Sequence, residues 1–402
     1  MALSLYGIID KFRLQKKQSG ALNGKTFMVK DLFDVQGKSS GNGNPSWQVW
    51  RQQNQMPPAP VNAPCVEKLL DAGAILTGRT QCDELALSLD GINENYSTPL
   101  NTLYPERIPG GSSSGSAAVT AGGLVDFALG TDTLGSVRVP AAYCGLFGIR
   151  PGHGSVPIEG VIPLGPSFDT VGWFSKDPEL IGAVNNVLTG ESSQSTSFTA
   201  RKVILPDVHF DIVHDSHRVP LYEKARAVSN NIAPVHDIAL DLRTLDMWIL
   251  VFSIIRSQEA WQYYGDWVDS GQARISESIL PRLLEGKNLT VSEVDFARRV
   301  KIAAEQLIAS YFAGDSIICI PTTWNLPAPL NSSEEVLSEY RRANSRLSIL
   351  SVISGLPQLA FPVRLDAQAV MSLSFLGPPG SESGLISLVF DLVDQKLIGE
   401  SW

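Results

Sequence analysis

Short apolar runs alternate with longer segments of helical periodicity along most of this 402-residue chain. Apolar runs bounded by turn residues are typical of buried strands, whereas apolar positions three or four residues apart indicate amphipathic helices. The strands expected on this basis are Lys25–Lys30, Ala74–Thr77, Val125–Gly130, Gly145–Ile149, Lys202–Leu205, Val235–Leu240, Ser316–Pro321, Gln358–Val363 and Ala369–Ser374. The expected helices are Ala63–Gly73, Ser116–Leu124, one between Trp173 and Ala200, Pro220–Asn230, Leu242–Tyr264, Val291–Phe312, Glu334–Ser354 and Leu385–Leu397.

This alternation predicts an α/β fold in which helices cover a central sheet. No change in composition marks a linker, so residues 1–402 are expected to form a single domain. The polar segment GESSQSTSFTA at residues 190–200 is expected to be a surface loop.

The stretch Pro109–Gly148 stands out because two glycine- and serine-rich turns enclose a run of small and apolar residues. The residues of Ser116–Leu124 are too small for an ordinary amphipathic surface helix, which favours a close-packed buried helix. Serines at the mouths of such turns are candidate nucleophiles.

Composition and charge narrow the function classes. Hydrophobic residues make up 44% of the chain and charged residues 18%, and the formal net charge is −9 with Lys and Arg scattered. Because phosphate backbones are bound by clustered basic residues, a nucleic-acid partner is not expected. The four cysteines lack CxxC spacing, which argues against zinc and favours small buried side chains in a reducing compartment.

The N-terminal residues contain no long apolar run of the kind that a signal peptide needs, so a cytoplasmic location is expected. The most apolar local run, Ile249–Ile255, is flanked closely by Asp246, Arg256 and Glu259. These charges favour a buried helix over a membrane segment or a membrane-surface role, and no membrane partner is expected.

A serine-hydrolase interpretation centres on Gly111–Gly115 (GSSSG), which matches the G-x-S-x-G elbow of α/β-hydrolases with Ser113 as nucleophile. The elbow needs an apolar strand directly before it, but residues 104–111 (YPERIPGG) contain two prolines and two charges. It also needs a downstream histidine base, and of the five histidines only His153 follows an expected strand. The context therefore disfavours this interpretation.

A second constellation combines Lys30 at the end of a strand with Ser112 and Ser136 in the two turns. The segments that carry it are Phe27–Asp31 (FMVKD), Gly110–Ala118 (GGSSSGSAA), Gly130–Ala142 (GTDTLGSVRVPAA) and Cys144–Gly145. In this order and spacing they resemble the signature of the amidase signature family. The resemblance covers nearly the whole chain. Together with Gly43–Trp47 (GNPSW) and Ser167–Phe174 (SFDTVGWF), it favours the short plant-type amidases that hydrolyse indole-3-acetamide.

The resemblance implies the family fold, with a central mixed β-sheet covered by helices, and a Ser–cisSer–Lys triad. Ser136 is implied as the nucleophile, Ser112 as a bridging serine preceded by a cis peptide bond, and Lys30 as the base. The chemistry is consistent, because a lysine can accept a serine proton only where desolvation keeps part of its population neutral. Backbone N–H groups of Thr133, Leu134, Gly135 and Ser136 are expected to form the oxyanion hole. No metal or organic cofactor is required.

Several neighbouring residues have expected supporting roles. Gly111 eases the steric demands of the implied cis bond, and Asp132 with Arg138 is expected to brace the nucleophile turn, with direct substrate contact as the alternative. Ser113 and Ser114 are expected to be helix N-cap and first-turn residues, and Cys144 to be a packing residue. Leu134 departs from the family, which has glycine there. A leucine with positive φ at this position would be strained, and its side chain would narrow the pocket.

Three function classes remain open at this point. They are an amidase for a small primary amide, a glutaminase-type subunit of a tRNA-dependent amidotransferase, and a catalytically silent binding module on the same fold. The sequence does not identify the amide. Aromatic candidates for a pocket wall, each with ordinary packing as the alternative, are Trp47, Trp50, Phe168, Trp173 and Trp324. The resemblance is also compatible with a homodimer.

Overall fold

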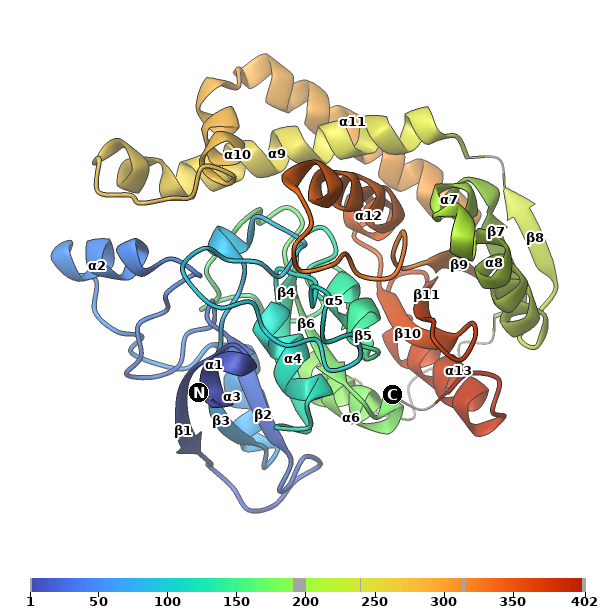
Figure 1. The fold of residues 1–402 in the computed structure, drawn as a ribbon, viewed down its shortest axis with the longest axis horizontal. Coiled ribbons are helices and arrows are strands. Elements are labelled where there is room, and N and C mark those ends of the chain that lie inside the picture. Colours follow the sequence, from blue (N-terminus) through green and yellow to red (C-terminus); the bar gives the residue numbers. More distant parts are fainter. Residues whose placement is uncertain (1, 191–199, 239, 313–314, 400–402) are drawn as a thin grey trace.

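An 11-stranded mixed β-sheet runs through the molecule (Figure 1). The computed structural model describes residues 2–190, 200–238, 240–312 and 315–399. The strands are β1 (Ile8–Leu14), β2 (Thr26–Lys30), β3 (Ile75–Thr80), β4 (Phe127–Asp132), β5 (Phe147–Arg150), β6 (Thr170–Ser175), β7 (Lys202–Pro206), β8 (Val235–Ile238), β9 (Ser316–Pro321), β10 (Gln358–Arg364) and β11 (Val370–Leu376). Their order across the sheet is β1-β3-β2-β4-β6-β5-β10-β11-β9-β7-β8.

Two groups of parallel strands lie towards the ends of the sheet. Strand β2 is parallel to β3 and β4, and β7 is parallel to β8 and β9. Antiparallel pairs through β6, β5, β10 and β11 join the two groups. The predicted α/β fold with a central mixed sheet and a single domain is therefore confirmed.

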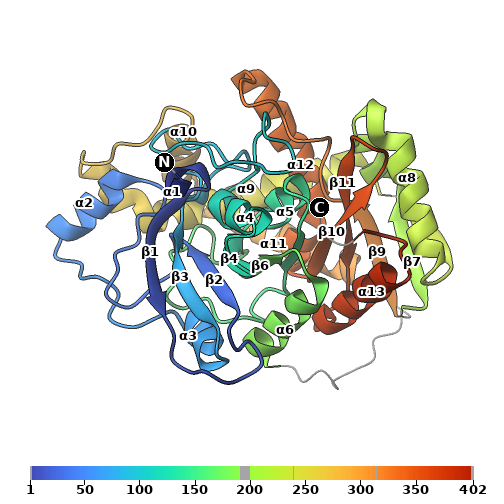
Figure 2. The ribbon, with the colours of Figure 1, turned by 60° about the horizontal axis from the view of Figure 1, so that its bottom comes forward.

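Helices cover both faces of the sheet (Figures 1 and 2). The helices are α1 (Ala2–Leu5), α2 (Pro45–Gln53), α3 (Pro64–Asp71), α4 (Ser114–Ala121), α5 (Arg138–Tyr143), α6 (Pro178–Thr189), α7 (Asp207–Ile212), α8 (Asp215–Asn230), α9 (Leu242–Asp269), α10 (Leu280–Leu284), α11 (Val291–Tyr311), α12 (Glu334–Ser354) and α13 (Glu382–Asp394), with 3₁₀ turns at Glu84–Ala86 and Glu285–Asn288. Helices α3, α6, α8 and α13 pack on one face. On the other face, α4 lies against β2, β3, β4 and β6, α5 lies against β5, β10 and β11, and α9, α11 and α12 lie against the C-terminal strands.

The alternation of side chains along each strand creates the two cores. On β7 and β9, Val203 and Ile317 point into the larger core, whereas their neighbours Ile204 and Ile318 point into the core under α9, α11 and α12. Successive strand residues face opposite sides. These strands are therefore apolar at consecutive positions, and the sequence pattern identifies them.

Most predicted elements are present with ends that differ by a few residues, and β9 and α12 have the predicted bounds. The expected strand at Ala74–Thr77 extends to Thr80, and the expected buried helix begins two residues earlier, at Ser114. Strands β1 and β6 and the short helices α2, α5 and α7 were not predicted. Residues 191–199 of the expected polar loop lie outside the described residues.

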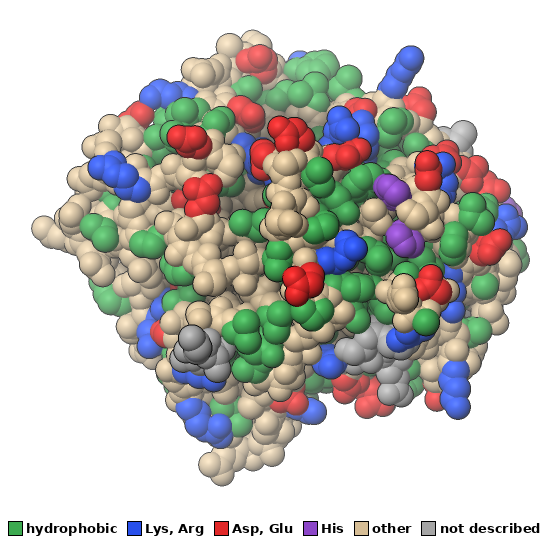
Figure 3. All heavy atoms as spheres, viewed as in Figure 1, with side chains coloured by type: hydrophobic (Ala, Val, Ile, Leu, Met, Phe, Trp, Pro, Cys, Tyr) green, Lys and Arg blue, Asp and Glu red, His purple; other side chains and the backbone are tan. Residues whose placement is uncertain are grey.

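On the face seen in Figure 3, basic and acidic side chains are interspersed rather than gathered into a broad field of one sign. All four cysteines are buried and free, as their spacing predicts. Within the described ranges, no helix is both long enough and apolar enough to cross a membrane. The expected absence of nucleic-acid and membrane partners and the cytoplasmic location stay predictions.

Candidate active site

Lys30 is fully buried at the carboxyl end of β2. Its Nζ lies 2.8 Å from Ser112 Oγ and 2.8 Å from Thr131 Oγ1 on the neighbouring strand β4. Burial lowers the pKa of Lys30 from its usual value, although nearby carboxylates, including Asp83, oppose this shift. The amine is therefore easier to deprotonate than an exposed lysine, and it contacts one hydroxyl that the sequence places in the triad.

Ser112 lies in the first serine turn, and the Gly111–Ser112 peptide bond is cis, as the resemblance implies. Asp83 fixes this turn, because its N–H donates to the Ser112 carbonyl at 3.1 Å and its Oδ2 accepts from Gly91 N at 3.0 Å. A Cβ at Gly111 would approach Asp83 Oδ2 to 2.1 Å, so the Asp83 carboxylate occupies the space that a side chain at 111 would need. Burial raises the pKa of Asp83 to about 7.

Ser136 lies in the turn between β4 and α5, next to the first serine turn. Its carbonyl accepts from Ser113 N at 3.2 Å, which ties the two turns together. Gly135 has φ 129°, and a Cβ there would lie 2.7 Å from Ser348 Oγ, so both backbone conformation and space require glycine. Leu134 does not have positive φ, so the strain anticipated at this position is absent.

The four expected oxyanion donors are not equivalent. The N–H of Gly135 donates to Asp132 Oδ1 at 2.7 Å and is therefore engaged within the protein. The N–H groups of Thr133, Leu134 and Ser136 donate to no other described residue. The side chain of Thr133 is held from outside the turn, since its Oγ1 donates to Asp169 Oδ1 at 2.6 Å. Three of the four N–H groups therefore have no partner among the described residues.

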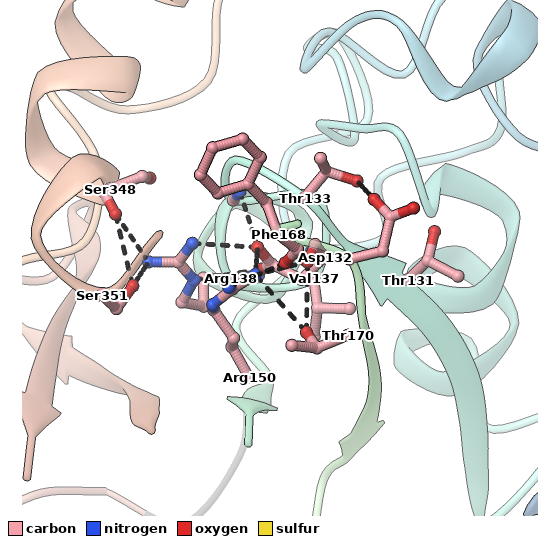
Figure 4. A network of polar contacts seen from close by, with 12 residues as sticks. Thr131, Asp132, Thr133, Val137, Arg138, Arg150, Phe168, Thr170, Ser348 and Ser351 are labelled. Carbon is pink, nitrogen blue, oxygen red and sulfur yellow. Dashed lines mark hydrogen bonds and ion pairs between the residues drawn. The ribbon is translucent and has the colours of Figure 1, made fainter. Parts of the chain in front are cut away.

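Asp132 is the centre of a buried polar network that supports the turn (Figure 4). Arg138 donates to both carboxylate oxygens, from Nη2 at 2.9 Å and from Nε at 3.0 Å, and Arg150 contacts the same carboxylate at 3.3 Å. Burial by itself raises the pKa of Asp132, but attraction to Arg138 and Arg150 holds it well below its usual range. Asp132 and Arg138 therefore form the expected brace.

The brace extends to the opposite side of the site. Arg138 Nη1 donates to Ser351 Oγ at 2.7 Å on α12 and to Gln358 Oε1 at 2.5 Å on β10. Arg138 is fully buried and is not among the residues that line the cavity at Ser136. This arrangement favours the structural role of Arg138 over direct substrate contact.

A cavity of about 340 Å³ opens at Ser136 between the nucleophile turn, the Ala86–Leu89 segment and helices α9, α10 and α12. Its apolar lining includes Leu134, Leu164 and Phe252, and it is also lined by arginines. Leu134 is half-buried and also packs against the core under α9 and α12. Leu134 is therefore both a cavity residue, as the expected narrowing of the pocket requires, and a packing residue.

The structure does not bring the elbow residues together as a site. Ser113 is buried, and its hydroxyl donates to Thr131 O at 3.2 Å and accepts from Thr131 N at 3.3 Å. It occupies the N-cap position of α4 but makes no side-chain cap bond, and no strand directly precedes it. His153 is exposed and contacts the Pro166 carbonyl. Cys144 is buried in an apolar cluster, as expected for a packing residue.

None of the five proposed aromatic residues lines this cavity. Trp47, Phe168 and Trp173 are buried in the apolar cores, which confirms the packing alternative for them. The aromatic residue at the cavity is Phe252, which lies within a predicted helix and was not singled out. Asp83, Thr131 and Arg150 were also missed, because their roles depend on contacts between segments that are distant in sequence.

The arrangement can perform acyl transfer through a serine. A desolvated amine contacts one serine hydroxyl, a second serine lines the cavity, and free backbone N–H groups lie in the same turn. Among the described residues there is no group of three or more His, Cys, Asp or Glu side chains that could hold a metal ion.

Comparisons with known proteins agree with this chemistry. A family model described as Amidase matches residues 7–211. Amidase 1 of Arabidopsis thaliana is 34% identical over 92% of this chain and 93% of its own length. Outer envelope protein 64, chloroplastic, from the same plant is 32% identical over 92% of this chain and 66% of its own length. A crystal structure of an amidase superposes with a TM-score of 0.84 at 27% identity, covering 94% of this chain and 86% of the other.

The extent of these matches, together with the buried lysine and the two serine turns, identifies the chain as an amide hydrolase that belongs to the amidase signature family.

Proposed function

We propose that this enzyme hydrolyses a small primary amide to a carboxylic acid and ammonia through Ser136, Ser112 and Lys30. The observation that carries the proposal is the fully buried Lys30 amine, 2.8 Å from Ser112 Oγ. An exposed lysine stays protonated at neutral pH and could not accept a proton from a serine hydroxyl, whereas a buried lysine can. The resemblance favours indole-3-acetamide as the amide, and we include it as the neutral aromatic reference substrate.

In the proposed first step, neutral Lys30 accepts the Ser112 hydroxyl proton while Ser112 accepts the proton of Ser136. Ser136 Oγ attacks the carbonyl carbon of the substrate amide. The carbonyl oxygen of the substrate then becomes an oxyanion beside the free N–H groups of Thr133, Leu134 and Ser136. One such donor is typically worth about 10²–10³ in rate. The Asp132 network contributes by fixing the turn in which these donors lie.

In the second half of the cycle, Ser112 returns a proton to the departing nitrogen, which leaves as ammonia, and Lys30 restores the Ser112 proton. Water then attacks the acyl-enzyme by the reverse relay and releases the acid. Protons and charges balance without a cofactor. Burial lowers the pKa of Lys30, which supports this sequence because the amine has to alternate between its two protonation states.

The two other function classes have less support. A catalytically silent binding module would not require a buried lysine in contact with a buried serine, because binding alone needs no proton transfer. A glutaminase-type subunit would bind glutamine, and the cavity lining offers its ammonium group no free carboxylate, because Glu334 is already paired with Arg341.

The proposal is tested by ammonia release from a panel of indole-3-acetamide, aliphatic primary amides, amides that carry a carboxylate, and glutamine. We expect turnover of at least one non-amino-acid amide, and loss of that turnover in Ser136→Ala. Ser113→Ala is the matched control, because it removes a neighbouring buried hydroxyl that is bonded only to Thr131 backbone groups. An enzyme without turnover of any amide, or a fully active Ser136→Ala variant, contradicts the proposal.

Replacement of Leu134 is expected to change substrate ranking. Because Leu134 lines the cavity next to Ser136, Leu134→Ala should favour bulkier acyl groups by roughly 10- to 200-fold in kcat/KM relative to small ones. Its packing against the core predicts a simultaneous loss of stability, below the about 2–5 kcal/mol typical of a fully buried leucine. Measurement of kcat/KM for small and bulky amides, with melting temperatures, checks both effects. An unchanged ranking would make Leu134 a packing residue alone.

A further inference from the structure

The wall of the cavity opposite the nucleophile turn is cationic. Arg256 of α9, Arg282 of α10, and Arg341 and Arg342 of α12 all line it, whereas Glu334 is the one carboxylate in the lining. Helices α10 and α12 both pack against α9, which lies across the upper part of Figure 1. An uncharged amide supplies no counter-charge to these arginines, so the partners that each arginine has within the protein decide which of them needs a ligand.

Arg341 is neutralised by its neighbours. It forms ion pairs with the buried Asp90 and with Glu334, and it bridges these two carboxylates. Glu334 is therefore already engaged. Arg342 is exposed at the edge of the cavity, where water solvates it. Neither of these two arginines requires a ligand.

Arg256 differs, because it is buried and has no counter-ion. Only 9% of the residue is exposed, and it makes no ion pair with any described residue. Its one hydrogen bond to the part of the chain that the structure describes is long, 3.4 Å from Nη1 to the Arg282 carbonyl. The guanidinium carbon lies 6.0 Å from the centre of the Phe252 ring, which also lines the cavity.

The charged groups nearest to Arg256 do not neutralise it. Glu285 favours its charged form from beyond ion-pair distance and accepts a hydrogen bond from Ser257, while Arg282 opposes that charge. Burial lowers the pKa of Arg256 to about 10, so the guanidinium remains charged at neutral pH. Arg282 donates to the Leu87 carbonyl at 2.7 Å and likewise has no ion pair among the described residues.

A buried cation without a counter-ion is costly, and proteins tolerate one mainly where a ligand supplies the charge. The guanidinium group has planar N–H donors that match the two oxygens of a carboxylate. The stem of the side chain packs close to the Gly165 backbone, since the Arg256 Cγ lies 3.1 Å from where a Cβ would stand at Gly165. Arg256 therefore places an unpaired cation in the same cavity as Ser136.

Building on the proposed function, we propose that the preferred substrate is a primary amide with a carboxylate on its acyl chain, and that Arg256, assisted by Arg282, binds this carboxylate. The product is then a dicarboxylic acid. Indole-3-acetamide leaves Arg256 unpaired, and glutamine brings an ammonium group towards the arginines.

The test compares matched amides by kcat/KM. Succinamate, glutaramate and adipamate carry the carboxylate at three distances from the amide. Their methyl esters have the same carbon chain without the charge and are the neutral controls, with amide hydrolysis measured as ammonia release. Glutamine differs from glutaramate only by its ammonium group. We expect the best of the three anions to exceed its own ester by about 10- to 100-fold, the range of one charged hydrogen-bond pair. We also expect glutaramate to exceed glutamine.

Arg256→Gln should remove this preference, because KM for the anionic amide should rise by more than KM for its neutral ester. Arg256→Lys should retain part of the preference, because it keeps the charge without the planar donors. Arg243→Gln is the matched control, since Arg243 is an exposed arginine on the same helix. If Arg256→Gln does not fold, Arg282→Gln provides the same comparison at the second arginine.

The outcomes separate the two proposals. Equal kcat/KM for amide hydrolysis of the neutral methyl esters and the anionic amides overturns the carboxylate site and leaves the amidase function intact. A preference for the anionic amides that survives in both Arg256→Gln and Arg282→Gln has the same consequence. Failure to hydrolyse any of the amides, neutral or anionic, overturns the proposed function itself.

Discussion

Replacement of Lys30 by methionine is expected to lower kcat for amide hydrolysis by about 10²–10⁴-fold, the usual contribution of a positioned base. The fold should persist, because methionine fills the same space and removes a buried amine that has no ion pair within the described residues. Lys30→Arg should be little better than methionine, since a guanidinium remains protonated. Steady-state kinetics together with circular dichroism checks both expectations.

The matched control is Lys25→Met, just before the start of β2, where the side chain is exposed and lies near Asp126. In the wild type, kcat/KM should rise with pH as Lys30 loses its proton. The midpoint should lie below 10.5, because burial lowers the pKa of this amine. Near-wild-type rates for Lys30→Met, or a rate that falls as pH increases through this range, would exclude Lys30 as the base.

Replacement of Asp132 by asparagine is expected to cost about 3–5 kcal/mol of unfolding free energy. Arg138 and Arg150 are fully buried, and the substitution leaves both without a carboxylate partner. A buried ion pair need not stabilise a fold relative to apolar residues, but removal of one partner leaves an uncompensated charge. Activity should fall too, because the Gly135, Val137 and Arg138 N–H groups lose their charged acceptor.

Urea unfolding of Asp132→Asn measures this effect, with Asp126→Asn as control. Asp126 precedes the same strand but is about one-third exposed, so its substitution should cost about 0–1 kcal/mol. The contribution of Asp132 to the free energy of unfolding should depend on pH in a defined direction. The pKa of Asp132 is lowered on folding, so its contribution is complete above the unfolded value of 3.8 and is lost as pH falls below it. Equal stability losses in the two variants would show that the buried network does not brace the turn.

Much of the fold was predictable because its strands are buried on both faces. Apolar residues occupy successive positions on β9, so the strand can be recognised without knowing its register or its neighbouring strands. Strand β1 was missed because it lies at the edge of the sheet, where its side chains alternate between half-buried and exposed and charged residues are tolerated. Strand β6 was missed because Thr170–Ser175 follows a region rich in glycine and proline, which conceals its start.

The proposed catalytic residues were predictable because two of them lie in glycine- and serine-rich turns that resemble the family signature, whereas the residues that surround them were not predictable. Nothing in the local sequence indicates that Asp83 packs against Gly111, or that Arg150 reaches Asp132. Both contacts join segments that are far apart in sequence. The same is true of Arg256, which appears in the sequence only as a charge that ends an apolar run. Its burial and its missing counter-ion become visible once α9, α10 and α12 are placed around the cavity.

The identity of the nucleophile is the central claim, and covalent labelling tests it most directly. A serine-directed fluorophosphonate should add one label per chain, and peptide mass analysis should find it on the peptide that contains Ser136. The label should be lost in Ser136→Ala and retained in Ser113→Ala. A label on Ser113, or a Ser136→Ala variant that is labelled as fast as the wild type, would contradict the mechanism proposed for this amidase.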